Sequence, residues 1–442
     1  MKKILILGAG RSSSALISYV LAKASSNEWI VIVGDLSVEA ARERIGSANG
    51  SAVHFDIKDE VSSAQIISES DIVISLLPAD FHPLVARLCI EMKKHFLSAS
   101  YVSDRMKAFH QEALEKDLLF LNECGLDPGI DHMSAMQMID KIKTAGGTPT
   151  AFESFTGGLI TPDTDPENPW RYKFTWNPRN VVLAGQGTAK FLKDGQFKYV
   201  AYSQVFSRVT PIEVSGILYE GYPNRDSLKY MSIYGLQEIK TMIRGTLRNA
   251  GFCSAWNVLV QLGCCDDTYL MENVGDMTHR DFINSFIIGG ATGSSEDRIL
   301  STLRLSVSHE NIQPLRWSGL FSDEMIGLTQ GTPAKILEHI LNKRWRLLPG
   351  DRDMIVMWHR LGYLLNGSPH TMISHLTVEG HDEVQTAMAK TVGLPLGIAA
   401  RLLLQGKIKQ RGVVIPVQEE IYKPVLTELN SLGIAFVGDE SY

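Results

Sequence analysis

The chain has 442 residues, which is more than one hydrophobic core usually organises, so we expect at least two domains. Its hydrophobic and charged fractions, 44% and 21%, are ordinary for a soluble globular protein. The net charge of −6 argues against a nucleic-acid-binding protein, which would carry a basic patch. No apolar run reaches the roughly 20 residues of a membrane span, so no membrane partner is expected.

The cysteines and histidines show no metal or disulfide pattern. The five cysteines include no Cys-x-x-Cys pair, and the twelve histidines include no His-x-x-x-His pair on a helical face. We therefore expect reduced thiols in the cytoplasm and no bound metal. The apolar stretch after Met1 is too short for a signal peptide, and a glycine-rich turn follows it.

The first residues carry the signature of a dinucleotide-binding turn. A wholly apolar run, Ile4–Leu7, is typical of a strand buried on both faces of a parallel sheet. Gly8 and Gly10 follow it, and helical spacing begins at Ala15. Gly8 permits a tight turn, Gly10 lets the backbone approach a pyrophosphate, and the helix amino terminus faces the phosphate charge. Ser13 occupies the place where a third glycine often stands.

Strand-like runs and helical patterns then alternate up to residue 121. This alternation predicts an α/β fold with a Rossmann-type doubly wound parallel sheet. Ligands bind such sheets outside the carboxyl ends of the strands, which places Asp35, Asp56, Leu77, Ser100, Tyr101 and Asp127 around one crevice. The expected strands cover residues 29–33, 52–55, 72–77, 96–100 and 118–121, and the expected helices cover 38–45 and 84–92.

A series of motifs along nearly the whole chain resembles the saccharopine dehydrogenase family, above all its glutamate-forming saccharopine reductases. The most specific string is Leu126-Asp127-Pro128-Gly129-Ile130-Asp131-His132. The other matching segments are 75–78, 100–103, 122–125, 157–159, 172–176, 222–227 and 244–248. The resemblance implies interconversion of saccharopine with L-glutamate and 2-aminoadipate 6-semialdehyde. A hydride leaves the carbon beside the secondary amine for a nicotinamide cofactor, and the imine is then hydrolysed.

The resemblance also implies the domain organisation. We expect a dinucleotide-binding domain over residues 1–128 and about 385–442, and a mixed α+β substrate-binding and dimerisation domain over 129–384. Strand-like stretches (152–155, 199–202 and 212–214) indicate its sheet, and residues 231–341 resemble the family's helical insertion. Residues 386–393 are expected to form a helix that ends at a Gly393 cap.

Several residues match the family's substrate contacts. Saccharopine carries three carboxylates, and a guanidinium binds a carboxylate with two directional hydrogen bonds, so Arg225 and Arg248 are the predicted grips. Thr246, Leu247 and Ser100 are expected beside them, and Tyr101 and Asp127 are the expected catalytic pair. Asp127 precedes a proline, so it is also the predicted cap of the next helix.

Three positions limit what can be carried over from the family. Thr156 stands where some members have a cysteine proposed as an acid–base group, and a threonine hydroxyl does not titrate near neutrality. His82 and His132 lie inside matched motifs, but packing or capping explains each better than proton transfer does. We assign neither histidine a role at this stage.

Cofactor choice rests on the end of the second strand. Many family members that use NADP place an arginine there, whereas this chain has Asp35, which suits the ribose hydroxyls of NAD and repels a 2′-phosphate. Arg11 could offset part of that repulsion. NAD is therefore predicted, with NADP as the alternative. The full predicted cofactor set is Gly8, Gly10, Arg11, Ser12, Ser13, Asp35, Asp56, Leu77, Ser100, Leu126, Asp127 and Thr175.

Two other functions remain open. A relative acting on lysine or carboxyspermidine would keep the fold and change the substrate, and a dinucleotide-binding regulator would have no turnover. Two arginine grips favour saccharopine over substrates with fewer carboxylates. The only expected partners are small molecules and a second copy of the chain, since closed two-fold dimers are the commonest oligomers.

Overall fold

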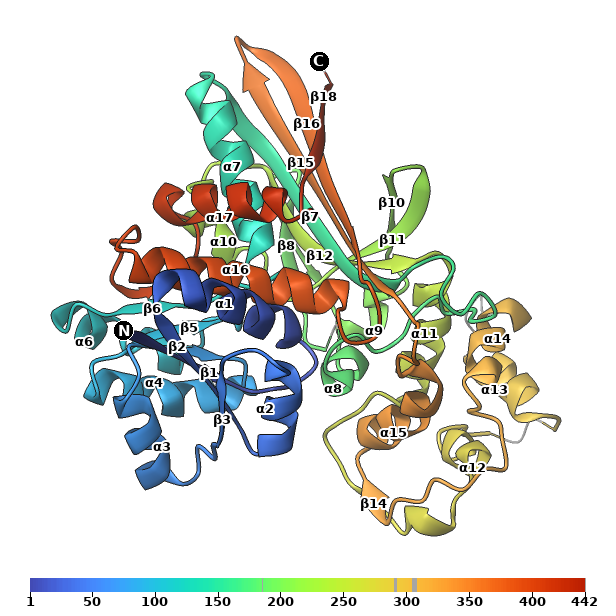
Figure 1. The fold of residues 1–442 in the computed structure, drawn as a ribbon. Coiled ribbons are helices and arrows are strands. Elements are labelled where there is room, and N and C mark those ends of the chain that lie inside the picture. Colours follow the sequence, from blue (N-terminus) through green and yellow to red (C-terminus); the bar gives the residue numbers. More distant parts are fainter. Residues whose placement is uncertain (185, 290–291, 304–307, 442) are drawn as a thin grey trace. The chain divides into compact units, whose positions relative to one another are not determined.

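The computed structural model describes residues 1–184, 186–289, 292–303 and 308–441. The chain divides into two compact units (Figure 1). The first unit comprises residues 1–148, 365–368 and 376–437, and the second comprises 149–364, 369–375 and 438–442. The first unit thus extends past residue 128, where the domain boundary was expected. The roles assigned to the two domains stay predictions.

The first unit is built on a seven-stranded sheet in the order β17-β6-β5-β4-β1-β2-β3. All neighbouring strands are parallel, which confirms the predicted Rossmann-type sheet. The strand order reverses between β1 and β4, where such sheets bind their ligands. The strands are β1 (Lys2–Leu7), β2 (Trp29–Asp35), β3 (Ser51–His54), β4 (Ile72–Ser75), β5 (His95–Ser98), β6 (Leu119–Leu121) and β17 (Gly412–Val414).

Helices cover both faces of this sheet, and their starts follow local chemistry. Helix α2 (Val38–Ile45) has the predicted bounds because the Ser37 hydroxyl accepts the Ala40 amide and Gly46 has a positive φ. Helix α3 (Glu60–Ser68) was not predicted, although the Asp59 carboxylate caps it in the same way. The remaining helices are α1 (Ser14–Asn27), α4 (His82–Glu91), α5 (Asp104–Lys107), α6 (His110–Glu115), α7 (Ile130–Thr144), α16 (Ala387–Leu404) and α17 (Glu419–Ser431).

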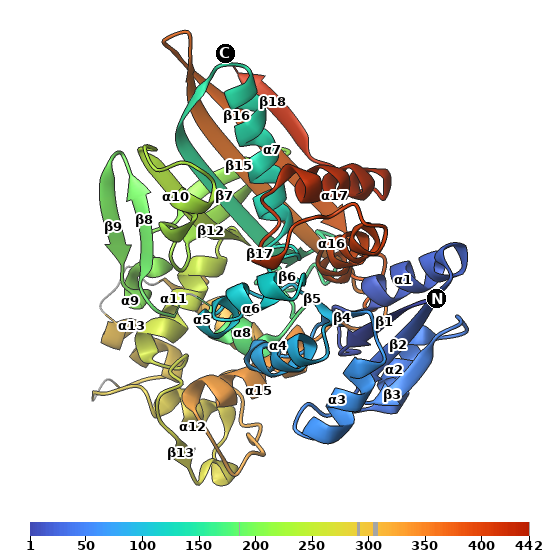
Figure 2. The same ribbon diagram turned by 90° about the vertical axis from the view of Figure 1, so that its left-hand side faces the viewer.

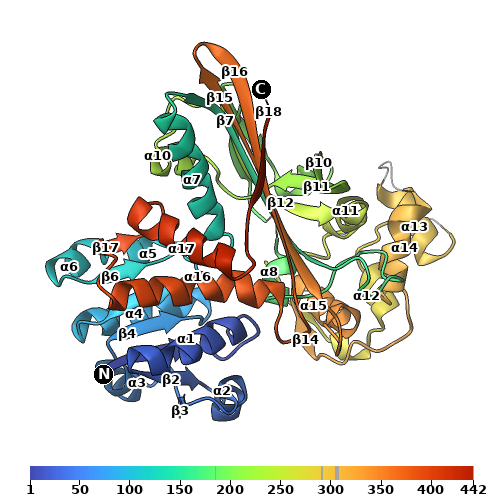
Figure 3. The same ribbon diagram turned by 45° about the horizontal axis from the view of Figure 1, so that its top comes forward.

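The expected helix end at Gly393 is wrong, because α16 continues through it to Leu404. Figures 1 and 3 show α16 lying along α1. A Cβ on Gly393 would lie 2.7 Å from the Leu16 backbone nitrogen, and one on Gly397 would lie 2.6 Å from the Tyr19 ring. Both glycines therefore serve close helix packing. Helix α16 is long and apolar enough to span a membrane, but 72% of it is buried inside the protein, as in a core helix.

A nine-stranded mixed sheet is formed mainly by residues of the second unit (Figure 2). The main order is β10-β11-β12-β7-β15-β16-β18, and the β8–β9 hairpin branches from β12. The strands are β7 (Thr148–Ile160), β8 (Ala189–Lys193), β9 (Gln196–Val200), β10 (Thr210–Val214), β11 (Ile217–Pro223), β12 (Thr241–Asn249), β15 (Asp353–Leu365), β16 (Ser368–Glu379) and β18 (Val437–Ser441).

Strand β12 falls inside the stretch that was expected to be mostly helical. It is a central strand, parallel to β7 and antiparallel to β11, so the continuous helical part begins only after it. That part contains α11 (Phe252–Leu262), α12 (His279–Asn284), α13 (Ser295–Leu303), α14 (His309–Trp317) and α15 (Pro333–Trp345). Short helices α8 (Pro178–Val182), α9 (Tyr202–Val205) and α10 (Lys229–Ile233) link the strands, and β13 (Met271–Glu272) pairs with β14 (Gln330–Gly331).

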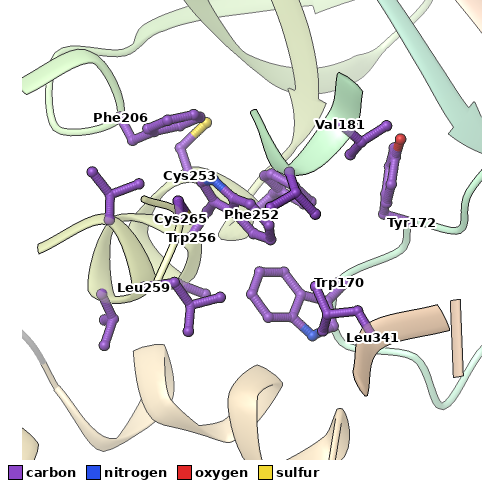
Figure 4. Packing of buried hydrophobic residues seen from close by; sticks show 14 of the residues in the cluster. Trp170, Tyr172, Val181, Phe206, Phe252, Cys253, Trp256, Leu259, Cys265 and Leu341 are labelled. Atoms are coloured by element: carbon purple, nitrogen blue, oxygen red, sulfur yellow. The ribbon is translucent and has the colours of Figure 1, made fainter. Parts of the chain in front are cut away.

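An aromatic cluster forms the core of the second unit (Figure 4). Trp170 lies at its centre, with ring centroids 5.4 Å from Phe252, 6.0 Å from Trp256 and 5.1 Å from Trp345. Its indole nitrogen donates to the Pro314 carbonyl at 2.8 Å, so the buried polar atom is satisfied. This core holds the loop before α8 against α11, α14 and α15.

The close packing of α1 on α16 yields the first prediction. On an exposed helix, Gly→Ala stabilises by up to about 1 kcal/mol. At Gly393 the added methyl would meet the α1 backbone, so Gly393→Ala should instead lower the free energy of unfolding by about 1–3 kcal/mol. Urea denaturation measures this change. Lys390→Ala in the same helix is the control and should change it by less than about 0.5 kcal/mol. A stabilised Gly393→Ala variant would contradict the packing argument.

Candidate functional site

The glycine turn after β1 lies directly against the end of β4. Gly8 has a φ of +101°, and its N–H donates to the Gly34 carbonyl at 2.8 Å. A Cβ there would lie 3.2 Å from the Leu76 backbone, whereas nothing lies within 4 Å of a Cβ built on Gly10. Ser13 is buried, and its hydroxyl donates to the Gly10 carbonyl at 2.8 Å. The turn is therefore closed on the Gly8 side and open at Gly10, as a phosphate cradle requires.

Asp35 holds this turn through its carboxylate. One oxygen accepts the Ala9 N–H at 2.7 Å, and the other accepts the Ser37 N–H at 2.9 Å. Asp35 does not cap α2, because Ser37 does. Arg44, in the last turn of α2, donates from Nε to the Ala9 carbonyl at 3.3 Å. Only the fold brings this second cation to the turn, so sequence spacing did not identify it.

Two further crevice residues have local contacts of their own. The Asp56 carboxylate accepts the Lys58 N–H at 3.0 Å, directly after β3. Leu77 is half-buried after β4, and Leu126 is buried after β6. Their predicted contacts with a cofactor stay predictions.

The turns after β5 and β6 are joined by Glu123. Its N–H donates to the Ser100 carbonyl at 3.1 Å, and its Oε1 accepts the Val102 N–H at 2.9 Å. This connection brings the Tyr101 hydroxyl to Asp127 Oδ1, to which it donates at 3.2 Å. Ser100, Tyr101 and Asp127 are therefore gathered at one edge of the sheet, although they come from two strand ends.

A buried charge network lies behind this pair of turns. His132 Nε2 lies 2.9 Å from Glu123 Oε2, and Nδ1 lies 3.7 Å from Asp131 Oδ2. Asp131 Oδ1 accepts the Gly129 N–H at 2.6 Å. All three side chains are almost wholly buried. The sequence analysis placed His132 inside a motif but did not identify its two carboxylate neighbours, because their meeting depends on the turn between β6 and α7.

Asp127 is not the cap of α7, so the capping hypothesis is wrong. The helix begins at Ile130 with Gly129 as its N-cap residue, and the Asp127–Pro128 peptide bond is cis. Gly129 has a φ of +149°, and a Cβ there would lie 2.0 Å from the Gly125 carbonyl oxygen. Only glycine fits this helix start. The Asp127 carboxyl is thereby left half-buried beside Tyr101.

His82 joins the ends of β4 and β5. In the first turn of α4, its Nδ1 lies 3.1 Å from Ser75 Oγ and its Nε2 lies 2.8 Å from Ser100 Oγ. Burial lowers the pKa of His82 to about 4, so the ring is neutral at physiological pH. The Ser100 N–H separately donates to Ser98 Oγ at 3.0 Å.

In the second unit, polar residues alternate along β12. Arg244, Thr246 and Arg248 share one face of the strand because their spacing is two. Thr246 is paired in register with Thr156 on β7, and its hydroxyl accepts from the Asn224 amide at 2.7 Å. The arginine–threonine–arginine alternation was present in the sequence as a strand signal, and the helical expectation for this region obscured Arg244.

Arg248 is a buried cation that meets no anionic side chain in the part of the chain that the structure describes. Its Cζ lies 5.1 Å from the Tyr172 ring centre, 6.0 Å from that of Tyr222 and 5.2 Å from that of Phe252. It forms no ion pair with the described residues; its Nη1 donates to the Leu247 carbonyl at 3.1 Å, and its Nε has no hydrogen-bond partner among them. Burial disfavours its charge, but the two phenols raise the pKa of Arg248, and it stays cationic. Such a group requires an acceptor.

The other predicted residues of this unit are not gathered in the same way. Arg225 is exposed, has a φ of 52° and follows β11. Arg225 lies beyond the end of β11, whereas Arg248 is in register with Glu220 in the middle of that strand. The Leu247 side chain points to the opposite face from Arg248. Thr156 and Thr175 are buried, and neither hydroxyl has a partner among the described residues.

Two family models together cover most of the chain. The saccharopine dehydrogenase NADP binding domain matches residues 4–121, and the saccharopine dehydrogenase C-terminal domain matches residues 125–434. The chain belongs to the saccharopine dehydrogenase family. The predicted family and the predicted nicotinamide-cofactor domain are confirmed. The choice of NAD over NADP stays a prediction, which the name of the matched domain does not favour.

Curated and solved members of the saccharopine dehydrogenase family align over nearly the whole chain. The saccharopine dehydrogenase [NADP(+), L-glutamate-forming] of Saccharomyces cerevisiae is 32% identical over 97% of this chain and 96% of its own length. A solved apo structure of the yeast L-Glu-forming enzyme superposes with a TM-score of 0.89, at 30% identity and full coverage of both chains. The mitochondrial alpha-aminoadipic semialdehyde synthase of Bos taurus is 34% identical over 98% of this chain.

The chain spans about half the length of that bovine relative, 47%. A homospermidine synthase from Legionella pneumophila, solved with NAD, superposes with a TM-score of 0.56 at 10% identity, which shows a shared fold.

The buried neutral His82 generates a pH prediction. Its pKa is lower in the folded state than the usual 6.5, so the unfolded state binds the proton first and stability falls as pH drops from about 6.5 towards 4. His82 should account for a loss of about 2 kcal/mol in the free energy of unfolding between pH 7 and pH 5. Urea denaturation of His82→Gln should show a pH dependence smaller by that amount. Equal pH dependence in both proteins would contradict the assignment.

Proposed function

We propose that this chain is a glutamate-forming saccharopine dehydrogenase of lysine metabolism. It interconverts saccharopine, water and an oxidised nicotinamide cofactor with glutamate, 2-aminoadipate 6-semialdehyde, the reduced cofactor and a proton. The observation that carries the proposal is Arg248, whose buried cation lacks an anionic partner among the described residues. A carboxylate of the substrate supplies that partner. The yeast relative, which aligns with this chain over nearly its whole length, is an L-glutamate-forming saccharopine dehydrogenase.

The cofactor fits the residues of the first unit. The open space at Gly10 accommodates a pyrophosphate, since a Cβ there would meet nothing within 4 Å. The amino terminus of α1 adds a favourable field for the phosphate charge. Asp35, Arg11 and Arg44 are the charged residues proposed for the adenosine end. When bound, the nicotinamide accepts the hydride that leaves the carbon beside the amine.

Asp127 and Tyr101 carry the proton chemistry in this proposal. Tyr101 donates a hydrogen bond to Asp127 Oδ1 and so orients the carboxylate. The other carboxylate oxygen can then accept a proton from the amine or from the water that adds to the imine. Thr156 cannot take this role because its hydroxyl does not titrate near neutral pH. Arg248 is the proposed grip for one substrate carboxylate, and Arg225 is the proposed grip for a second one.

A spectrophotometric assay with purified protein tests the proposal. Saccharopine should reduce the nicotinamide cofactor with an absorbance rise at the reduced form's band. Because the Asp35 carboxylate repels a 2′-phosphate, we expect a larger kcat/KM with NAD than with NADP. A preference for NADP would mean that the attraction of Arg44 and Arg11 for the 2′-phosphate outweighs this repulsion. Turnover of lysine or carboxynorspermidine without saccharopine turnover would overturn the substrate. No turnover of any of these amines would leave the regulator hypothesis.

Arg248 supports a prediction with two readouts. Arg248→Met keeps an apolar stem among the rings but leaves a substrate carboxylate unpaired, which should cost roughly 2–5 kcal/mol in kcat/KM for saccharopine. The free energy of unfolding should stay the same or rise, because a buried unpaired charge has been removed. Arg208→Met, an exposed arginine of the same unit, is the control and should change neither quantity. Loss of stability with unchanged kinetics would make Arg248 purely structural.

Asp127→Asn tests the proton transfer. Asparagine preserves the shape of the side chain and can still accept the Tyr101 hydrogen bond, but it does not titrate. A general acid–base role predicts a fall in kcat of roughly 100-fold or more and loss of one limb of the pH–rate profile. Since α7 is capped by Gly129, stability should barely change. An unaltered pH profile with normal turnover would remove Asp127 from the mechanism.

A homodimer located in the cytoplasm is also proposed. The exposed aromatic side chains of Phe197 and Tyr199 on the β8–β9 hairpin are candidate interface residues. Light scattering should give twice the 49.0 kDa mass of one chain, and a value near 49.0 kDa would exclude the dimer. The location needs direct imaging, because the bovine relative's name describes a mitochondrial protein.

A further inference from the structure

We infer that His82 is a positioning residue that fixes the direction of the Ser100 hydroxyl proton. The inference rests on the proposed function, in which Ser100 contacts the bound ligands. His82 itself is too deeply buried to meet a ligand, with 2% of its surface exposed. Its effect is therefore transmitted through Ser100 Oγ, 2.8 Å from Nε2.

The imidazole is held in one place from three sides. Nδ1 lies 3.1 Å from Ser75 Oγ, Nε2 faces Ser100, and the ring lies edge-on to Phe96 with centroids 5.9 Å apart and planes at 70°. Ser75 and Ser98 are in register on the neighbouring strands β4 and β5. His82 therefore connects the fully buried hydroxyl of Ser75 to the half-buried hydroxyl of Ser100, at the sheet edge where ligands of this fold bind.

The contact bears on the Ser100 hydroxyl and is not needed to shape the turn. The Ser100 N–H donates to Ser98 Oγ at 3.0 Å, and the Ser100 carbonyl accepts the Glu123 N–H at 3.1 Å. The backbone of Ser100 is thus held on both sides without His82. What His82 adds is a fixed partner for a hydroxyl that would otherwise rotate.

A neutral imidazole has one N–H and one acceptor nitrogen, so its tautomer determines what Ser100 offers to a ligand. With the proton on Nε2, the ring donates to Ser100 Oγ, and the serine's own proton points towards the ligand. Saccharopine and the cofactor present many acceptor oxygens, so this is the productive arrangement. Ser75 then donates its hydroxyl proton to Nδ1, which completes a one-way chain from Ser75 through His82 to Ser100.

Matched variants of His82 separate positioning from packing. The side-chain amide of His82→Gln reaches towards the place of Nε2, whereas that of His82→Asn reaches only the place of Nδ1. If His82 acts through Ser100, His82→Asn should lower kcat/KM for saccharopine roughly 3- to 30-fold, as expected for one lost hydrogen bond. His82→Gln should recover part of that loss. Equal losses in both variants would contradict positioning.

A double-mutant cycle with Ser100→Ala decides whether the effect passes through Ser100. In the Ser100→Ala background, His82→Asn should cause no further loss of kcat/KM. Losses that multiply would overturn the inference and leave a packing role. Urea denaturation of all four proteins accompanies the kinetics. A folding defect would appear there as a lower free energy of unfolding in the variants that lose kcat/KM.

A measurement that needs no turnover completes the test. In wild-type protein, ¹⁵N shifts of the His82 ring should show the proton on Nε2, and Ser100→Ala should shift the Nε2 signal. A proton on Nδ1, or no response to Ser100→Ala, would overturn the inference. If the wild type does not oxidise saccharopine, the proposed function fails by that result alone. If the wild type is active and the losses of kcat/KM from His82→Asn and Ser100→Ala multiply, only the role of His82 is rejected.

Discussion

The buried carboxylate of Glu123 is the contact on which the proposed catalytic edge of the first unit depends. One carboxylate oxygen accepts the Val102 N–H, and the other lies against His132 Nε2. The backbone N–H of Glu123 donates to the Ser100 carbonyl. Parallel strands alone would leave the turns after β5 and β6 as separate loops. A carboxylate in a low-dielectric interior holds such groups more firmly than it could at the surface, because water does not compete. Tyr101 and Asp127 meet as a result.

In the second unit, the cation of Arg248 is surrounded by aromatic rings and pairs with no carboxylate among the described residues. Tyr172, Tyr222 and Phe252 surround Arg248, and their ring faces stabilise the guanidinium without neutralising it. An internal aspartate or glutamate would have satisfied the charge more fully. It would also have competed with any ligand carboxylate for the same hydrogen bonds. The aromatic surroundings therefore keep the arginine charged and available.

The elements that were predicted correctly follow local rules, and the others depend on distant neighbours. Strands β1, β4, β5 and β6 appear in the sequence as apolar runs because these parallel strands are buried on both faces. The prediction that a helix ends at Gly393 was wrong because a glycine suits both a helix cap and a close contact between helices. Only the position of Leu16 in the fold distinguishes the two. Strand β12 was obscured because residues 231–341 were assigned to a helical insertion as one block, although the alternating polar residues of β12 are a strand signal. The family motifs located Asp127 and Arg248, but the carboxylate neighbours of His132 required the folded turn.

The packing of α16 on α1 has a consequence for how the protein forms during synthesis. Helix α1 follows the glycine turn directly, yet its partner α16 begins only at Ala387, 360 residues after α1 ends at Asn27. At roughly 5–20 residues per second, a ribosome needs roughly 20–70 s to supply that partner. During this interval the apolar face of α1 around Leu16 has no permanent cover. The cofactor turn therefore becomes fully supported only after α16 has been synthesised.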